Sequence, residues 1–365
     1  QDGQVVWQKI QEELPSIPPH ELEILYVKGQ LPEKGRRFLR VRYFLKMPVP
    51  GLEIGYELGV DEIEMPKSKS ASRQTDDEVS GQISVEEAER FVILKGNDFT
   101  YTYDKFLGAF SSLKKMEREY LKYPVEYNIW RAPTDNDRKI RLEWERAGYH
   151  RAQVRTYETR VIRNAPKEME IITQLSVSAV HIQRILDIKT RWKVDVQGQI
   201  KVDMDVKKNE EFPFLPRFGL RFFFYRDLER VRYCGMGADE SYPDKHQASW
   251  HGIFEGDVRT MHRPYLKPQE YGSHWDCSWC ELLGKKLAVR IHSETPFMFQ
   301  ASSYTQEELS AKAHNFELQE ADSTILCLDY KQSGIGSGSC GPQLSEQYQL
   351  NDSDFSCNWT IKLGK

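Results

Sequence analysis

The hydrophobic pattern of this chain has the period of a β-strand over most of its length. Residues 99–103 alternate aromatic and threonine positions, and residues 37–45 alternate charged and apolar positions. A period of two places successive side chains on opposite faces of a sheet. We therefore predict a series of strands in the part of the chain after residue 81, at residues 91–94, 99–103, 153–162, 169–178, 183–194, 199–206, 219–224, 231–234, 273–283, 287–292, 298–302 and 324–330.

Helical patterns are few. One is predicted at residues 140–147, and Thr305 with Glu308 three positions later is typical of the capping box that begins a helix. Many short strands with few helices favour an all-β fold, a large antiparallel β-supersandwich over residues 82–365. The chain lacks the strand–helix alternation over ~250 residues that a catalytic (β/α)8 barrel requires.

The first 66 residues predict a separate and smaller β unit. Strand patterns occur at residues 5–7, 21–26, 37–45 and 55–66. About four strands are fewer than the ~7 of a closed immunoglobulin-type sandwich, so residues 1–66 are predicted to be a partial immunoglobulin-like domain. Residues 67–81 have almost no apolar side chain and are predicted to be a polar linker.

Composition narrows the class of protein. The net charge is −4 with acids and bases well mixed, which favours no nucleic-acid partner. Mean hydropathy is −0.64 and no apolar run approaches the ~20 residues of a membrane span, so no membrane partner is expected. We expect a cytoplasmic protein with mostly buried, reduced thiols, because its six cysteines are scattered along the chain.

No metal site is predicted. Cys277 and Cys280 form a C-x-x-C pair, but alternation along residues 273–283 would place them on opposite faces of a strand, where they cannot share a metal. The nine histidines have no spacing typical of metal ligands.

The glycine-richest stretch follows the predicted strand at 324–330. Gly336, Gly338 and Gly341 satisfy G-x-G-x-x-G, the pattern of a dinucleotide-binding loop. Such a loop must open a helix whose N-terminus meets the pyrophosphate. Pro342 and the residues after it fit no helical stripe, so we reject the nucleotide interpretation and leave the function of the loop open.

Two polar clusters could carry chemistry. The first contains Arg131, Asp135, Asn136 and Asp137 in a loop before the predicted helix. These side chains could form turns and cap the helix, or they could hydrogen-bond sugar hydroxyls.

The second cluster contains Asp239, Glu240 and Tyr242. Adjacent acids on an extended loop point apart, so a shared acid/base pair is not expected of Asp239 and Glu240. Glu270 and His274 could form an acid/base pair further along, although solvated turn residues are the more ordinary interpretation.

Taken together and in this order, these motifs resemble the C-terminal part of the β-galactosidases of glycoside hydrolase family 2. The run Asn-Ile-Trp-Arg-Ala-Pro-Thr-Asp-Asn-Asp at residues 128–137 is the most specific of them. The resemblance implies a supersandwich of the kind seen in aldose mutarotases, preceded by the end of an immunoglobulin-like domain. The other matching runs are residues 99–107, 145–149, 215–220, 237–245, 265–272 and 334–342.

The resemblance also implies where the chemistry lies. In the family, the two catalytic glutamates belong to a (β/α)8 barrel that precedes this region, so no catalytic residue is expected in this chain. The Mg²⁺ and monovalent cation of the parent enzyme are held mainly by that barrel, so no cofactor is expected here. The glycine-rich loop, with Ser339, Cys340 and Gly341, would wall the substrate pocket, and Cys340 stands where some members have an aromatic residue.

The sequence thus predicts the non-catalytic C-terminal portion of a β-galactosidase that hydrolyses terminal β-galactosides with retention. Its expected partners are the β-galactoside substrate through the parent enzyme, the barrel of the same or another chain, and further copies in a homo-oligomer. One alternative is a natural small subunit of a two-chain enzyme. Another is a mutarotase-like sugar epimerase or a stand-alone carbohydrate-binding sandwich.

Overall fold

The computed structural model describes residues 2–11, 13–29, 35–66, 81–163 and 167–364. It divides into two compact units. The smaller comprises Gln1–Asp76 with His251–Ile253, and the larger comprises Asp77–Trp250 with Phe254–Lys365. Apart from Gly81, the predicted polar linker lies outside the described residues.

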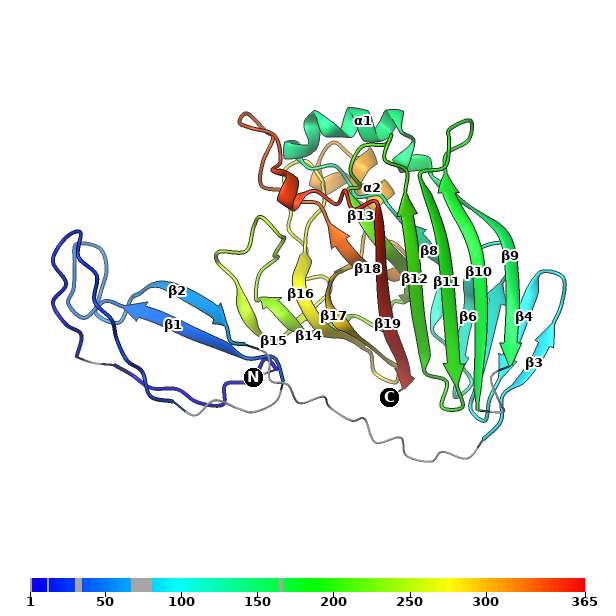
Figure 1. The fold of residues 1–365 in the computed structure, drawn as a ribbon, viewed down its shortest axis with the longest axis horizontal. Helices are drawn as coiled ribbons and strands as arrows, with labels where there is room; N and C mark the ends of the chain where they lie inside the picture. The colour runs from blue at the N-terminus through cyan, green and yellow to red at the C-terminus, as the bar shows by residue number, and fades with distance from the viewer. Residues whose placement is uncertain (1, 12, 30–34, 67–80, 164–166, 365) are drawn as a thin grey trace. The chain divides into compact units, whose positions relative to one another are not determined.

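The larger unit is built almost entirely from antiparallel strands (Figure 1), as the alternating sequence pattern predicts. A five-stranded sheet has the order β3-β4-β5-β6-β7, and a twelve-stranded sheet contains the rest. The strands are β3 (Ser84–Glu87), β4 (Phe91–Lys95), β5 (Phe99–Asp104), β6 (Ala109–Lys115), β7 (Arg118–Glu119), β8 (Leu121–Asn128), β9 (Gln153–Arg163), β10 (Glu168–Ser178), β11 (Leu186–Asp195), β12 (Ile200–Lys208), β13 (Arg217–Tyr225), β14 (Arg230–Gly237), β15 (Trp250–Asp257), β16 (Ser273–Leu283), β17 (Ala288–Ser302), β18 (Ser323–Gln332) and β19 (Asp354–Gly364).

The twelve-stranded sheet branches at β17. Its main path runs β15-β14-β16-β17-β19-β12-β11-β10-β9, and β17 also pairs with β18, which pairs with β13 and through it with β8. The first part of β17 pairs with β19 and the last part with β18. The two strands predicted at 287–292 and 298–302 are therefore one long strand that serves both branches.

Aromatic side chains fill the space between the two sheets. Trp192 of β11 meets Phe110 of β6 at 5.3 Å between ring centroids, edge to face. Tyr103 of β5 contacts Phe110 in the same way, and its hydroxyl lies 2.8 Å from the Thr173 hydroxyl of β10. The high aromatic content of the chain thus serves a sheet-on-sheet core.

Two short helices lie at one end of this sandwich, at the same end as the glycine-rich loop after β18 (Figure 1). They are α1 (Ile140–Arg146) and α2 (Gln306–Ala311), both near their predicted positions. The Thr305 side chain accepts the Glu308 backbone N–H at 3.0 Å, which is one half of the predicted capping box. The Glu308 carboxylate instead accepts the Gln319 N–H at 2.9 Å, so the second half is not formed. No helix in the described part of the chain combines the length and apolarity needed to cross a bilayer. Short 3₁₀ turns occupy Asp135–Arg138, Tyr149–Arg151, Asn315–Glu317 and Glu346–Tyr348.

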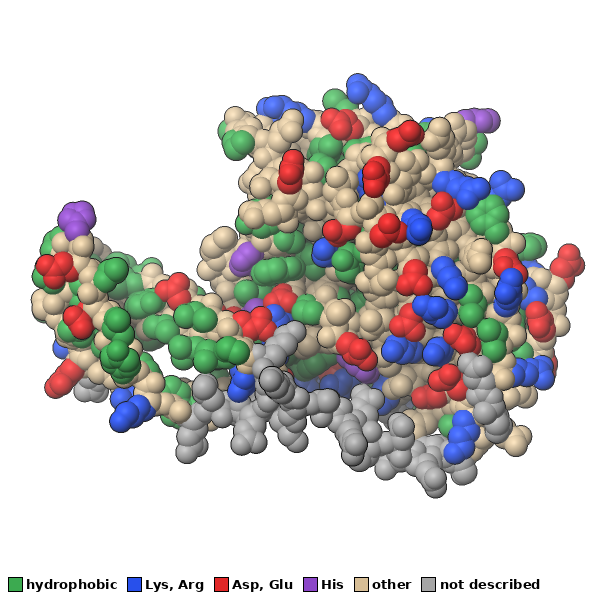
Figure 2. Space-filling model, viewed as in Figure 1, with side chains coloured by type: hydrophobic (Ala, Val, Ile, Leu, Met, Phe, Trp, Pro, Cys, Tyr) green, Lys and Arg blue, Asp and Glu red, His purple; other side chains and the backbone are tan. Residues whose placement is uncertain are grey.

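The smaller unit has one antiparallel pair, β1 (Phe38–Phe44) with β2 (Glu57–Glu64). The strands predicted at 5–7 and 21–26 are wrong: both segments are irregular, and Leu22 and Tyr26 are 98% and 88% exposed. An alternating segment becomes a strand only beside a hydrogen-bonding neighbour, and these segments have none among the described residues. No described residue in 2–66 is buried, and apolar side chains gather on the surface of this unit (Figure 2).

The two-face prediction for Cys277 and Cys280 is also wrong. The pairing of β16 with β17 shifts between His274 and Trp279, and Asp276 has a φ of 56°. A bulge of this kind breaks the two-residue period, so Cys277 and Cys280 both join the main core. None of the six cysteines forms a disulfide bond, and five of them are buried.

Candidate functional site

The glycine-rich loop, residues 333–341, connects β18 to the segment before β19. It opens no α-helix, since the next regular turn is the 3₁₀ segment Glu346–Tyr348. The loop therefore does not present the helix N-terminus that a pyrophosphate needs. This agrees with rejecting the dinucleotide interpretation.

An internal carboxylate occupies the backbone donors of the loop. Asp244 accepts the Ile335 N–H at 2.9 Å and the Gly336 N–H at 2.7 Å, one on each oxygen. A Cβ atom at Gly334 would lie 2.4 Å from the Asp244 carboxyl carbon. Glycine at this position therefore lets the carboxylate approach the chain.

Arg131 holds the same loop through its carbonyl groups. Its side chain is fully buried, donates to the Ser333 carbonyl, and donates to the Gly334 carbonyl at 3.0 Å. Two parallel bonds of 2.8 and 3.1 Å join it to Asp137, whose carboxylate also accepts the Thr134 N–H at 2.9 Å. Arg131 and Asp137 are thus saturated by the protein, and Asp137 caps its own turn.

Asn136 provides a third contact to the loop, whereas Asp135 points elsewhere. The Asn136 amide donates to the Ile335 carbonyl at 2.6 Å. Gly338 has a φ of 103°, and a Cβ there would lie 2.8 Å from the Asn136 carbonyl oxygen. Asp135 is exposed, and its backbone N–H bonds Gln269.

The second polar cluster supports the loop from a neighbouring turn. Glu240 accepts bonds from Lys245 (2.5 Å), the Tyr265 hydroxyl (2.6 Å) and the Gly272 N–H (2.7 Å). Burial alone would raise the pKa of Glu240, but these donors outweigh it and lower the pKa. Asp239 is exposed and pairs with Arg263, so the two adjacent acids do point apart.

Tyr242 is fully buried in this second cluster. Its hydroxyl accepts the Ser273 N–H at 3.4 Å. Burial raises the pKa of Tyr242 well above its usual value. Its phenol ring therefore packs in the interior and offers no surface for a sugar.

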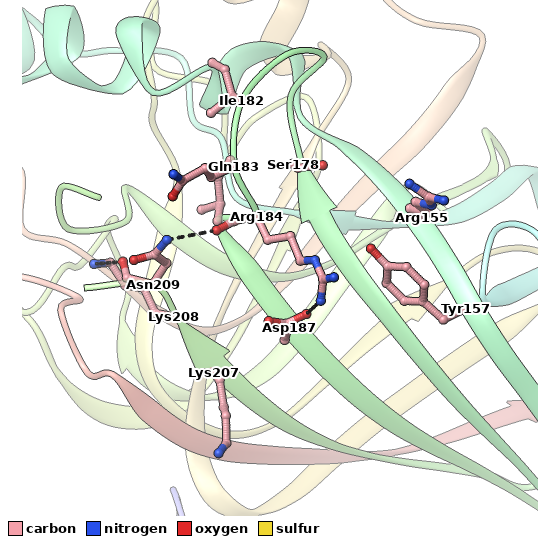
Figure 3. A pocket seen from close by; sticks show the side chains of 11 residues that line it. Arg155, Tyr157, Ser178, Ile182, Gln183, Arg184, Asp187, Lys207, Lys208 and Asn209 are labelled. Atoms are coloured by element: carbon pink, nitrogen blue, oxygen red, sulfur yellow. Dashed lines mark hydrogen bonds and ion pairs between the residues drawn. The ribbon is translucent and has the colours of Figure 1, made fainter. Parts of the chain in front are cut away.

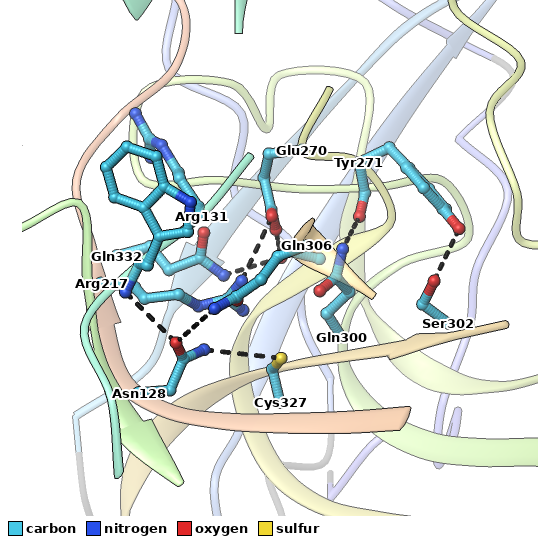
Figure 4. Close-up of polar contacts among 12 residues, drawn as sticks. Asn128, Arg131, Arg217, Glu270, Tyr271, Gln300, Ser302, Gln306, Cys327 and Gln332 are labelled. Carbon is cyan, nitrogen blue, oxygen red and sulfur yellow. Dashed lines mark hydrogen bonds and ion pairs between the residues drawn. The ribbon is translucent and has the colours of Figure 1, made fainter. Parts of the chain in front are cut away.

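Sequence reasoning missed a buried charge network around Arg217 that reaches Gln332, the last residue of β18 before the loop. Figure 4 shows Arg217, Glu270 and Gln332 of this network. Arg217 of β13 donates to both oxygens of Asp329 at 3.0 and 2.6 Å and to Glu270 at 3.2 Å. Gln332 donates to Asp329 at 3.1 Å and to the Ser273 hydroxyl at 2.7 Å. Burial raises the pKa of Glu270 and of Asp329, each against the opposing effect of Arg217. The Leu-Pro-Arg-Phe-Gly run at 215–219 was the available signal.

Glu270 and His274 are buried rather than solvated, which corrects the ordinary interpretation of this turn. Glu270 is 1% exposed and His274 is 2% exposed. The His274 ring lies 4.2 Å from the Tyr233 ring, and burial lowers the pKa of His274 to about 4. Glu270 instead accepts the Ser273 hydroxyl at 3.1 Å. Both side chains therefore lie in the protein interior, each with a different partner.

The tip of the loop, residues 337–341, is not held by hydrogen bonds to other described residues as its start, residues 333–336, is. Cys340 and Gly341 are exposed and Ser339 is half-buried. No hydrogen bond or ion pair joins residues 337–341 to any other residue that the structure describes. The tip is thus the part of the loop that is free to contact another molecule.

A cavity of about 730 Å³ lies apart from this loop, over strands β9 to β12 (Figure 3). Arg184 in its wall pairs with Asp187 at 3.0 Å, and the Tyr157 ring lies 5.0 Å from the Arg184 guanidinium carbon. None of its lining residues is a histidine. Within the described ranges, no three or more His, Cys, Asp or Glu side chains gather to hold a metal ion.

Comparisons with known proteins point to the same family as the sequence motifs do. The family model described as "Beta galactosidase small chain" matches residues 95–361. The β-galactosidase of Actinobacillus pleuropneumoniae is 36% identical over 352 residues, which cover 96% of this chain and 34% of that protein. The β-galactosidase of Staphylococcus xylosus is 30% identical over 323 residues, covering 88% of this chain and 32% of that protein.

Solved structures similar to the chain include a galactose 1-epimerase from Lactobacillus acidophilus, with a TM-score of 0.42 and 10% identity. That match covers 78% of this chain and 99% of the epimerase. The chain itself spans about one third of the length of the curated relatives described above. Since the family model covers most of the chain, the chain belongs to the β-galactosidase small chain family.

Proposed function

We propose that this chain is the non-catalytic C-terminal portion of a cytoplasmic β-galactosidase that hydrolyses terminal β-galactosides with retention. In this proposal a barrel supplies the catalytic glutamates together with the Mg²⁺ and monovalent cation of the parent enzyme. The present chain packs on that barrel, supports homo-oligomer contacts and shapes the substrate pocket. Its length relative to the two β-galactosidases above supports this division of labour.

The glycine-rich loop is the single observation that carries the proposal. Residues 333–336 are fixed by Arg131, Asn136 and Asp244, while the exposed tip makes no bonds within the described residues. A wall of a substrate pocket must hold its position before substrate arrives, because misplacement by 1 Å can cost about 100-fold in rate. The anchored residues 333–336 meet that requirement at the start of the loop. In this proposal the tip, with Ser339, Cys340 and Gly341 facing the sugar, is held by contact with the barrel.

The buried carboxylates of this chain support the assignment of catalysis to a barrel. A retaining glycosidase needs two carboxyl groups about 5–5.5 Å apart on either side of the scissile bond. Glu270 and Asp329 share Arg217 in the interior and are 1% and 0% exposed, so no glycoside can lie between them.

A chimera tests the proposal. Residues 1–365 would replace the matching C-terminal third of the A. pleuropneumoniae β-galactosidase, and the hydrolysis of a nitrophenyl β-galactoside would be measured. We expect activity in the chimera and none in the same enzyme cut before the replaced third. A folded chimera without activity would refute the proposal.

The natural small-subunit alternative is favoured by one observation, the description of the family model as a small chain. It differs from the first proposal only in whether the barrel is covalently attached. Mixing residues 1–365 with a separately expressed barrel portion distinguishes them. Recovery of activity on mixing supports the two-chain form, and activity in the fused chimera alone supports the single chain.

A further inference from the structure

We propose that Asp244 is a positioning residue of the parent enzyme: it orients the glycine-rich loop by binding two successive backbone N–H groups. This inference rests on the proposed function, because it concerns how the pocket wall is held. Asp244 lies outside the loop, on the segment after β14, and is 91 residues from Ile335 in the sequence.

The contact geometry assigns this role to Asp244 in particular. Each of its two oxygens accepts one N–H, from Ile335 and from Gly336, at 2.9 and 2.7 Å. Hydrogen bonds to an ionised acceptor are about twice as strong as neutral ones. The carboxylate therefore fixes both the place and the rotation of this dipeptide.

The glycines of the loop fit this carboxylate closely. A Cβ at Gly334 would lie 2.4 Å from the Asp244 carboxyl carbon, and one at Gly336 would lie 3.1 Å from its Oδ2 atom. Gly341, at the exposed end, has nothing within 4 Å of its own Cβ position. Two of the glycines thus lie where the carboxylate approaches the backbone.

The remaining anchors cannot replace Asp244. Arg131 and Asn136 bind carbonyl oxygens of residues 333–335, whereas Asp244 is the acceptor that holds N–H groups of residues 335 and 336. Those two residues are the last anchored positions before the free tip. Loss of Asp244 would therefore extend the unanchored part of the loop to Gly336, while residues 333–335 stay bound through their carbonyl groups.

Substitution of Asp244 in the full-length enzyme tests the role. We expect Asp244→Ala to lower kcat/KM by about 10- to 100-fold, and Asp244→Asn, which keeps one acceptor oxygen, to recover part of the loss. Asn136→Ala, a milder change, should give a smaller decrease. Asp352→Ala removes an exposed acid that pairs with Lys331 and should leave kcat/KM unchanged.

A spin label on Cys340 supplies a second readout in residues 1–365, because the other five cysteines are buried. Asp244→Ala should increase the mobility of the label, and Asp352→Ala should not. Unchanged kinetics in an active full-length enzyme, or an unchanged label, would overturn this inference alone. A full-length enzyme that never hydrolyses β-galactosides would instead overturn the proposed function.

Discussion

Arg217 neutralises two carboxylates in the interior of the larger unit. It is fully buried, as are its partners Asp329 and Glu270. We expect Arg217→Met to lower the free energy of unfolding by about 3–5 kcal/mol, because it leaves two buried acids without this cation. Chemical denaturation followed by tryptophan fluorescence would measure the loss.

Arg221→Met is the matched control for that change. Arg221 lies on the same strand and pairs with Glu126 and Glu307, whose side chains are 50% and 56% exposed. Those acids remain hydrated when the arginine is removed, so a smaller loss is expected. Equal losses in the two variants would contradict the importance of burial at Arg217.

His274 makes stability depend on pH. Burial lowers its pKa to about 4 in the folded protein, whereas an unfolded histidine titrates near 6.5. Between these pH values His274 is protonated in the unfolded chain and neutral in the folded chain. The free energy of unfolding therefore falls as the pH drops from about 6.5 to 4. In His274→Phe this contribution, about 1.4 kcal/mol per pH unit, should disappear from urea-unfolding data. A variant with the wild-type pH slope would contradict the assignment.

Among the strands, the contact of β13 with β18 depends on a glycine. A Cβ at Gly219 would lie 2.0 Å from the Leu328 carbonyl oxygen, beside a shift in register between Phe218 and Gly219. Gly219→Ala should therefore lower stability by roughly 1–3 kcal/mol and shift the Tm downward. Gly364→Ala on β19, where nothing lies within 4 Å, should change the Tm little. Similar Tm values for the two variants would refute the close approach.

Many strands with a clear two-residue period could be predicted from sequence, because that period is local. Strand β19 also alternates but was not predicted, and neither were β6 and β15. Strand β8 was missed, since Leu121–Asn128 mixes charged and aromatic residues and owes its pairing to β13 about 90 residues later. The opposite error occurred at residues 21–26, where the pattern is present but no neighbouring strand is described.

The candidate site was predictable only as a set of separate motifs. The glycine pattern drew attention to residues 333–341, and the polar runs drew attention to Arg131 and Glu240. Their meeting could not be predicted, because Arg131 contacts Ser333 across 202 positions of sequence. Asp244 was part of a noted run, but its role depends on a contact that only the fold creates.

For the molecule as a whole, the larger unit has the features of a rigid support. Its core extends through both sheets. Inside that core, Arg217 is hydrogen-bonded to the buried carboxylates of Asp329 and Glu270. The outer face over β9–β12 mixes acidic and basic side chains (Figure 2). These features suit a domain that holds a loop in place for chemistry performed by another domain.

The activity of residues 1–365 alone tests the central claim most directly. The purified chain would be incubated with a nitrophenyl β-galactoside, and the released nitrophenol would be followed by absorbance. We predict no turnover above the uncatalysed rate, because both accessible catalytic glutamates lie in the proposed barrel. Turnover that a point substitution within residues 1–365 abolishes would contradict the account.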